Sequence, residues 1–228
     1  MKNWWKIASV LLISYSIVWG FLGEVPRLPI LNETIRNLYF HVVMWFAMLG
    51  MMSFSLVFSI KVLSKGKRLS DINASQFAET GMVLATLGLV TGMVWANFTW
   101  GAPWTDDPKL NGTAITMIIY LAYFILRGSI EDPEKKARIS AVYNIFAFVL
   151  MIVFIGILPR LTDSLHPGNG GNPGFNNYDM DSNLRMVFYP AVLGWILLGI
   201  WISRIRVRLS VLQDKKNSKQ DKIYDSIQ

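Results

Sequence analysis

Three tryptophans lie close together in one turn-forming stretch of the chain, WANFTWGAPWTDD. They are Trp95, Trp100 and Trp104, and Gly101 and Pro103 between them favour a tight backbone. An indole has a large flat apolar face and one N–H donor, so several indoles together can wall a planar molecule. The segment therefore predicts a platform for a large, flat, apolar ligand.

The chain has two histidines, His41 and His166, and imidazole is a common axial ligand of haem iron. His41 lies near one end of an apolar run, in RNLYFHVVMWF, and His166 lies in a polar stretch after Pro159. Taken singly, His41 could be structural and His166 an exposed loop residue. Opposed across one iron, they would form a bis-histidine site, and the nearby tryptophans make haem the leading hypothesis.

Charged residues beside these positions could bind haem propionates. Arg36 would lie about one and a half helical turns before His41, toward the aqueous rim, if helix begins that early. A guanidinium suits a carboxylate, although Arg36 could equally be an interfacial anchor. Lys109 is a second candidate. Asp106 and Asp107 could cap the following helix or bind a basic partner, and no nucleophile or second base accompanies them for acid/base catalysis.

Long apolar runs must position these residues. The chain of 228 residues is 53% hydrophobic and 13% aromatic, too apolar for an ordinary soluble domain of its size. A helix needs about 20 mostly apolar residues to cross a bilayer, and backbone groups in lipid must be satisfied within the element. We therefore predict an all-α, polytopic membrane protein with one domain, 1–228. Its six transmembrane helices are expected at about 5–22, 37–61, 76–97, 112–126, 139–158 and 184–205.

Basic residues predict the orientation of these spans. Most of the 22 lysines and arginines fall at the N-terminus, after the second and fourth spans, and in the tail 206–228. Cytoplasmic loops are enriched in Lys and Arg, so both termini are predicted to be cytoplasmic and the tryptophan-rich loop, 98–111, to face outward. The net charge of +7 follows this topology, so it indicates anionic lipid near the tail and no nucleic-acid partner.

Several further signals concern the elements themselves. Pro159 is expected to end the fifth span, residues 64–75 to form an inner turn, and the Gly- and Asn-rich loop 160–183 to be mobile. Gly88 and Gly92 form a GxxxG pair, a helix-packing signal. Four methionines line one face of the second span, and we interpret this face as packing against other helices. They are Met44, Met48, Met51 and Met52. The chain has no cysteine, which excludes disulfides and thiolate metal sites.

The segment Trp100–Asp107, WGAPWTDD, resembles the WGxxWxWD signature of haem-handling proteins in cytochrome c maturation. Within that group the chain is similar to the CcmC, or haem exporter protein C, family. RNLYFH, ending at His41, resembles the family's Arg-x-x-Tyr-x-His opening of span two, and GMVW, ending at Trp95, resembles the lead-in to the signature. His166 matches the third-loop histidine by position. Asp106 replaces the third signature tryptophan, and Lys109 stands where the family often has Arg.

The resemblance implies a non-enzymatic role. Haem b is bound transiently and non-covalently at the periplasmic face of the bacterial inner membrane and delivered to a periplasmic haem chaperone, CcmE. Implied partners are the ATP-binding-cassette subunits CcmA and CcmB, which release the loaded chaperone, and a small CcmD-like membrane subunit. The implied site has axial ligands His41 and His166, a platform of Trp95, Trp100, Gly101, Trp104 and Asp107, and propionate contacts Arg36 and Lys109.

Other functional classes remain open. A small cytochrome b-like electron-transfer subunit would keep its haem permanently, whereas haem that leaves to an added apo-chaperone favours the delivery role. Cytochrome c synthetases share the tryptophan signature but are larger, with more spans and histidines. A transporter moving haem through its own spans would need a polar path. The apolar runs at the cores of the six spans, 7–23, 37–60, 80–105, 110–126, 139–159 and 186–203, contain no Asp, Glu, Lys or Arg.

Overall fold

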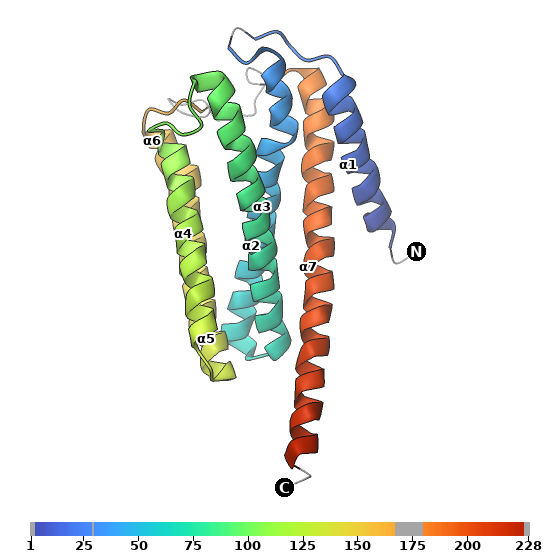
Figure 1. The fold of residues 1–228 in the computed structure, drawn as a ribbon, viewed down its shortest axis with the longest axis vertical. Coiled ribbons are helices and arrows are strands. Elements are labelled where there is room, and N and C mark those ends of the chain that lie inside the picture. Colours follow the sequence, from blue (N-terminus) through green and yellow to red (C-terminus); the bar gives the residue numbers. More distant parts are fainter. Residues whose placement is uncertain (1–2, 29, 167–179, 226–228) are drawn as a thin grey trace.

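The computed structural model describes residues 3–28, 30–166 and 180–225, with the backbone alone for 218–225. These residues form a bundle of long helices (Figure 1). The elements are α1 (Trp4–Leu22), η1 (Asn32–Tyr39), α2 (His41–Lys65), α3 (Arg68–Trp100), α4 (Pro108–Ser129), α5 (Pro133–Met151), η2 (Ile152–Ile157), α6 (Leu158–Leu161) and α7 (Ser182–Asp225). Six helical segments are long and apolar enough to cross a membrane, which confirms the predicted all-α, six-span fold. The expected mobility of loop 160–183 concerns mainly 167–179, which lie outside the described residues.

The helices begin and end at different residues from the apolar runs that predict them. α2 begins at His41 rather than near residue 37, because the preceding residues form the 3-10 helix η1. α3 takes in residues 98–100 of the expected tryptophan loop, and α7 makes most of the tail 206–228 helical. An apolar run marks the part of a helix that lies within the membrane, whereas capping residues mark the ends of the helix.

Capping residues explain the short connections. Gly66 ends α2 with a φ of +61°, and α3 starts two residues later, so the predicted turn over 64–75 is wrong. Gly101, with a φ of +80°, ends α3 in the left-handed conformation that glycine adopts without strain. Asp107 and Asp132 cap α4 and α5, and each is followed by a proline at the first helical position.

α2 lies at the centre of the bundle, where it packs against α3, α5 and α7 (Figure 1). Its methionines face this core, and none of the four is more than 4% exposed. The interpretation of the methionine face as packing is therefore confirmed. α1 lies at the edge, where the described helices that it contacts are α7 and η1.

The fifth span contains an irregular segment that carries the chain past Pro159. α5 passes into the π-helical segment η2, in which the N–H of Leu158 donates to the Val153 carbonyl. Pro159 then lies in the first turn of α6, where the missing N–H of proline costs little. The prediction that Pro159 ends this span is therefore wrong. The wider turn also brings the Phe154 carbonyl oxygen against Gly112 of α4, at a place where a Cβ would overlap it.

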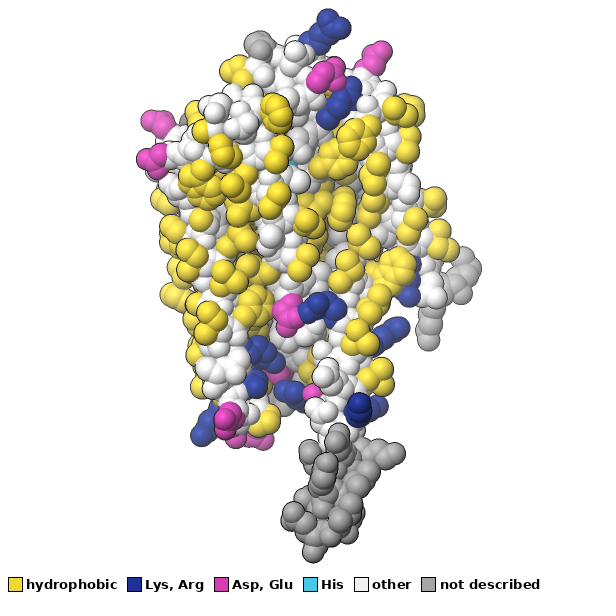
Figure 2. Space-filling view, in the orientation of Figure 1, with side chains coloured by type: hydrophobic (Ala, Val, Ile, Leu, Met, Phe, Trp, Pro, Cys, Tyr) yellow, Lys and Arg dark blue, Asp and Glu magenta, His cyan; other side chains and the backbone are white. Residues whose placement is uncertain are grey.

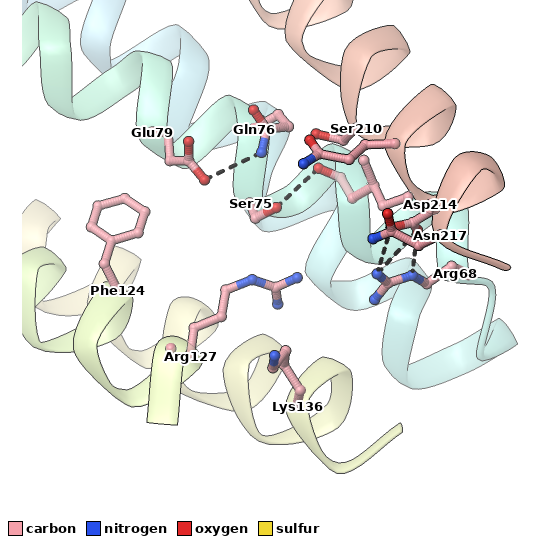
Figure 3. A pocket seen from close by; sticks show the side chains of 13 residues that line it. Arg68, Ser75, Gln76, Glu79, Phe124, Arg127, Lys136, Ser210, Asp214 and Asn217 are labelled. Atoms are coloured by element: carbon pink, nitrogen blue, oxygen red, sulfur yellow. Dashed lines mark hydrogen bonds and ion pairs between the residues drawn. The ribbon is translucent and has the colours of Figure 1, made fainter. Parts of the chain in front are cut away.

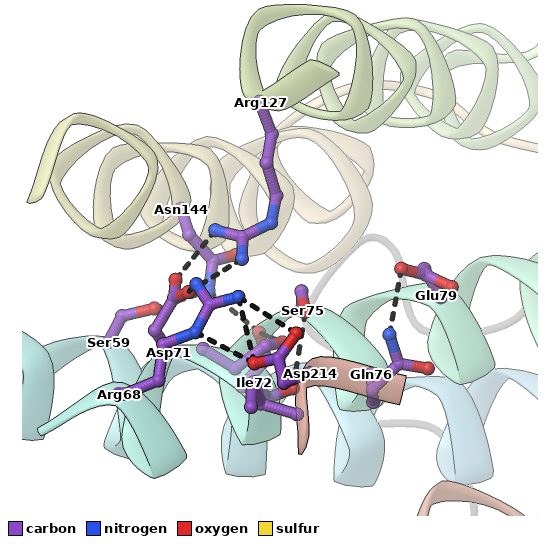
Figure 4. A network of polar contacts seen from close by, with 12 residues as sticks. Ser59, Arg68, Asp71, Ile72, Ser75, Gln76, Glu79, Arg127, Asn144 and Asp214 are labelled. Atoms are coloured by element: carbon purple, nitrogen blue, oxygen red, sulfur yellow. Dashed lines mark hydrogen bonds and ion pairs between the residues drawn. The ribbon is translucent and has the colours of Figure 1, made fainter. Parts of the chain in front are cut away.

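Ion pairs fasten α3, α4 and α7 at the end of the bundle opposite His41 (Figure 4). The Asp71 carboxylate is 2% exposed and accepts two hydrogen bonds from the Arg127 guanidinium, at 2.6 and 2.8 Å. Arg68 bridges Asp71 to Asp214 of α7. Losing one member would leave an uncompensated buried charge, so the network holds these three helices in one arrangement.

The outer surface of the bundle suits lipid. Figure 2 shows hydrophobic side chains over much of the flank, with most of the charged side chains on that face lying toward the two ends. Large apolar side chains stay exposed along the spans, including Leu11 at 65%, Val83 at 58% and Ile125 at 74%. Lipid tails are as apolar as these side chains and can cover them.

Candidate functional site

His41 is the first residue of α2, and its ring is held in one orientation by α3. Its Nδ1 lies 2.8 Å from the Gly88 carbonyl oxygen. A carbonyl can only accept, so Nδ1 carries the proton and the neutral ring keeps its lone pair on Nε2. This is the arrangement of a metal-binding histidine, in which one nitrogen is fixed by an acceptor while the other is left for the metal.

The two glycines of the GxxxG pair make room for this ring. A Cβ added to Gly92 would lie 2.5 Å from His41 Cε1, and one added to Gly88 would lie 2.9 Å from Trp45 Cε2. Contacts that short are not tolerated, so only glycine lets α2 and α3 approach with both rings between them. The predicted packing motif therefore also seats the histidine.

Two indoles stand edge-on to His41. The Trp45 and Trp95 rings lie 6.2 and 5.8 Å from the imidazole, measured between ring centroids. The Trp95 indole N–H donates to the Thr34 hydroxyl of η1 at 3.1 Å, which fixes the plane of that ring. Trp95 was predicted for the site and Trp45 was missed. The sequence signal for Trp45 is its position four residues after His41, which puts both side chains on the same face of the helix.

His166 is held in the same way by a carboxylate. Its Nδ1 lies 2.9 Å from Asp107 Oδ1, and the Trp100 ring meets the imidazole edge-on at 4.9 Å. A carboxylate accepts hydrogen bonds, so Nδ1 is again the donor and Nε2 is the nitrogen left for another partner. Both histidines therefore share one arrangement, although one acceptor is a backbone carbonyl and the other a side chain.

Asp107 joins the tryptophan-rich loop to the segment that carries His166. Its side chain is fully buried. Besides the imidazole, its carboxylate accepts from the Ser164 hydroxyl at 2.8 Å, from the Leu165 N–H at 2.7 Å and from two N–H groups at the start of α4. Asp107 was predicted as part of the platform, and the structure gives it the role of an anchor. Ser164, which helps to hold this segment, was missed by sequence reasoning.

Asp107 is an ionised anchor. Burial by itself would raise the pKa of its carboxyl, but the hydrogen bonds from His166, Ser164 and Leu165 outweigh burial and hold that pKa well below its usual range. The carboxylate therefore remains an acceptor at any physiological pH and keeps the His166 Nδ1 proton in place.

The two candidates for propionate contact differ in their surroundings. Arg36 is already engaged, because its Nη1 donates to the carbonyls of Gly20 and Gly23 at the end of α1 and its Nε pairs with Glu33. The Lys109 ammonium, in contrast, has no hydrogen bond or ion pair within the described part of the chain, and its side chain is half-buried. Lys109 is therefore the better-placed free cation.

The predicted site residues thus fall into two groups. Trp95 lies with His41, and Trp100 and Asp107 lie with His166. Trp95 and Trp100 lie five residues apart at the end of α3, which places both groups at one end of the bundle, called below the histidine end. Gly101 forms the turn after Trp100, and Trp104 is 39% exposed and makes no ring contact with the described residues.

Known proteins are similar to this chain over most of its length. Residues 1–222 match the family model described as "Heme exporter protein C", CcmC. The heme exporter protein C of Rhodobacter capsulatus is 26% identical over 212 residues, which cover 91% of this chain and 85% of that protein. The protein of the same name in Escherichia coli K12 is 24% identical over 216 residues, covering 93% and 85%.

A second kind of relative matches over a shorter stretch. The cytochrome c biogenesis protein CcsA of Prochlorococcus marinus strain MIT 9313 is 36% identical over 104 residues, or 41% of this chain and 32% of that protein. Since the family model covers nearly the whole sequence, this chain belongs to the Heme exporter protein C (CcmC) family.

Proposed function

We propose that this protein holds haem b as a transient, non-covalent cargo at its histidine end and passes it to a periplasmic haem chaperone during cytochrome c maturation. The observation that carries this proposal is the shared state of His41 and His166. Each ring donates from Nδ1 to a fixed acceptor and keeps Nε2 for another partner. Two such imidazoles at one end of a membrane protein fit the axial positions of one haem iron.

The surroundings of the histidines support the same cargo. Trp95 and Trp100 stand beside the two imidazoles, so apolar aromatic surface adjoins both proposed ligands. Trp104 is exposed in the same loop and is free to cover a macrocycle or to meet the chaperone. Lys109 has no ion pair with the described residues and could bind a propionate, whereas a contact from Arg36 would require it to share its bonds to α1.

The two ligands differ in a way that suits release. His41 is the first residue of α2, and its ring packs against Gly88 and Gly92 of α3. The packing of two long helices therefore sets its position. His166 lies outside any helix, and Asp107 holds it from another segment. We propose that His41 is the constant ligand and that His166 is withdrawn when the chaperone takes the haem. Any covalent bond to haem belongs to the chaperone.

Membership of the CcmC family supports the remaining parts of the proposal. The protein would lie in the bacterial inner membrane with its histidine end in the periplasm. It would work with a CcmE-like chaperone, CcmA- and CcmB-like subunits and a small CcmD-like subunit.

The proposal is tested by haem transfer between purified proteins. The detergent-purified protein is loaded with haem b, mixed with the apo form of a CcmE-like chaperone, separated from it, and both fractions are assayed for haem. Apomyoglobin serves as the control acceptor that captures any haem leaking into solution. Faster transfer to the chaperone than to apomyoglobin supports delivery. Haem that stays with the membrane protein and only cycles between redox states would mean a cytochrome b instead.

A further inference from the structure

A pocket of about 320 Å³ lies between the first turn of α1 and the middle of α7, at the end of the bundle away from the histidines. Three cations line it, Lys6 from α1 and Arg204 and Arg208 from α7. The two arginines are four residues apart and therefore share one face of their helix. Two indoles, Trp5 and Trp201, complete the walls and meet edge-on with ring centroids 6.4 Å apart.

No acidic group among the described residues balances the charge of this pocket. No Asp or Glu lines it, and none of the three cations forms an ion pair with the described residues. The Lys6 ammonium stands over the Trp5 and Trp201 rings at 5.8 and 5.3 Å, and the Arg204 guanidinium stands over Trp5 at 5.3 Å. These rings position the cations but carry no net charge, so the mutual repulsion of the cations remains.

A larger pocket at the same end shows the opposite arrangement. It has a volume of about 660 Å³, and Arg68, Arg127 and Lys136 are among its lining residues (Figure 3). Here, however, Arg127 and Arg68 both pair with the buried Asp71, and Arg68 also pairs with Asp214. The protein supplies its own anions in the large pocket, and the small pocket lacks them.

We propose that the pocket between α1 and α7 binds a phosphate group, carried either by an anionic membrane phospholipid or by a soluble phosphate compound. Two guanidinium groups and an ammonium group that meet in one pocket match the several oxygens and the negative charge of a phosphate. Indole rings lining the pocket are typical of the membrane interface, where phospholipid headgroups lie. Ile205, which is 45% exposed, is itself part of the pocket lining, so an apolar side chain that an acyl chain could contact lies beside the cations.

Such a ligand would add a contact between α1 and α7, the long helix against which α1 packs. α1 is held by α7 along its length and by η1 at its far end. A phosphate between Lys6 and the two arginines would bridge α1 to α7 at the near end. Because Arg36 binds the other end of α1, the first helix would then be fixed at both ends.

The experiment is native mass spectrometry of the full-length protein, delipidated in detergent and titrated with phosphatidylglycerol or phosphatidylcholine. A second arm measures the melting temperature in sodium phosphate against sodium chloride at equal ionic strength. The test variant is Lys6→Gln/Arg204→Gln/Arg208→Gln. The control, Lys65→Gln/Lys67→Gln/Lys135→Gln, removes the same charge elsewhere at that end of the molecule. Should the triple variant fail to fold, Arg208→Gln alone replaces it.

Wild type and control are expected to retain phosphatidylglycerol at least about tenfold better than the test variant, since each basic group near an anionic surface contributes roughly a fivefold gain. That result supports a lipid phosphate. Stabilisation by inorganic phosphate that only the test variant loses supports a soluble ligand at the same site. Equal behaviour of the test and control variants with both ligands overturns the proposal, because the ligands would then be attracted by the overall positive charge of this end of the molecule and not by the pocket.

Discussion

At the scale of single residues, the site depends on how each imidazole is held. The sequence predicts His41 and His166 as a pair, together with Trp95, Trp100 and the Asp107 carboxylate. It does not predict that Gly88 provides the acceptor for His41 or that Asp107 provides the one for His166. Such contacts join residues far apart in the chain, so they cannot be predicted from spacing or residue type.

Asp107→Asn tests the anchor. The amide can still cap α4 and fill the same space, but it presents one acceptor oxygen in place of two and no charge. Since partners of metal-binding histidines typically change metal affinity about 10- to 100-fold, haem retention should fall by that order. Haem titration of the detergent-purified variant measures this. Asp106→Asn, an exposed neighbour that bonds to the Asn111 side chain, is the matched control. Equal haem affinity in both variants would contradict the assigned role of Asp107.

The ionised state of Asp107 predicts a pH dependence. A carboxyl whose pKa is lowered by folding stabilises the protein fully above its ordinary pKa of about 3.9, and this contribution is lost as the pH falls through the lower folded value. The difference in melting temperature between wild type and Asp107→Asn should therefore stay constant from about pH 7 to 5 and shrink below about pH 4. A difference that already shrinks between pH 7 and 5 would mean that the carboxyl is not held ionised by its hydrogen bonds.

At the scale of elements, the apolar runs predict which segments cross the membrane, and capping residues decide where helices end. The tryptophan loop is shorter than predicted because Trp100 belongs to α3 and α4 starts directly after its cap, Asp107. The π-helical η2 and the 3-10 helix η1 have no such signal, because both depend on contacts with other helices. The GxxxG pair was predicted as packing, and its second role in seating His41 follows from which residues of α2 face it.

Gly92→Ala tests whether the space left by Gly92 positions the His41 ring. The added methyl group would lie 2.5 Å from His41 Cε1, so the ring or the helix must move. We expect weaker haem retention and a cost of about 1–3 kcal/mol in stability from overpacking. Absorption spectra and thermal melts of the purified variant measure the two effects. Gly50→Ala in α2 is the control, because its methyl group would make an ordinary 3.6 Å contact with Ile196. Normal haem binding in Gly92→Ala would show that the space left by Gly92 does not position His41.

At the scale of the whole molecule, basic residues predict which end faces the cytoplasm. The chain has no cysteine, so single cysteines can report this directly. Asp163→Cys near the histidine end should react with a membrane-impermeant maleimide in intact spheroplasts, because that end is predicted to be periplasmic. Lys135→Cys, at the opposite end, should react only after lysis. The reverse pattern would place the proposed haem site in the cytoplasm and exclude a periplasmic acceptor.

The proposed function requires that His41 and His166 bind the same iron. Absorption spectra of the detergent-purified, haem-loaded protein, oxidised and dithionite-reduced, test it most directly when wild type is compared with His41→Ala, His166→Ala and the double variant. We expect a low-spin bis-imidazole spectrum in the wild type, its loss in each single variant, and no specific haem in the double variant. A low-spin spectrum retained in both single variants, or a wild type that stays colourless with added haem, would contradict it.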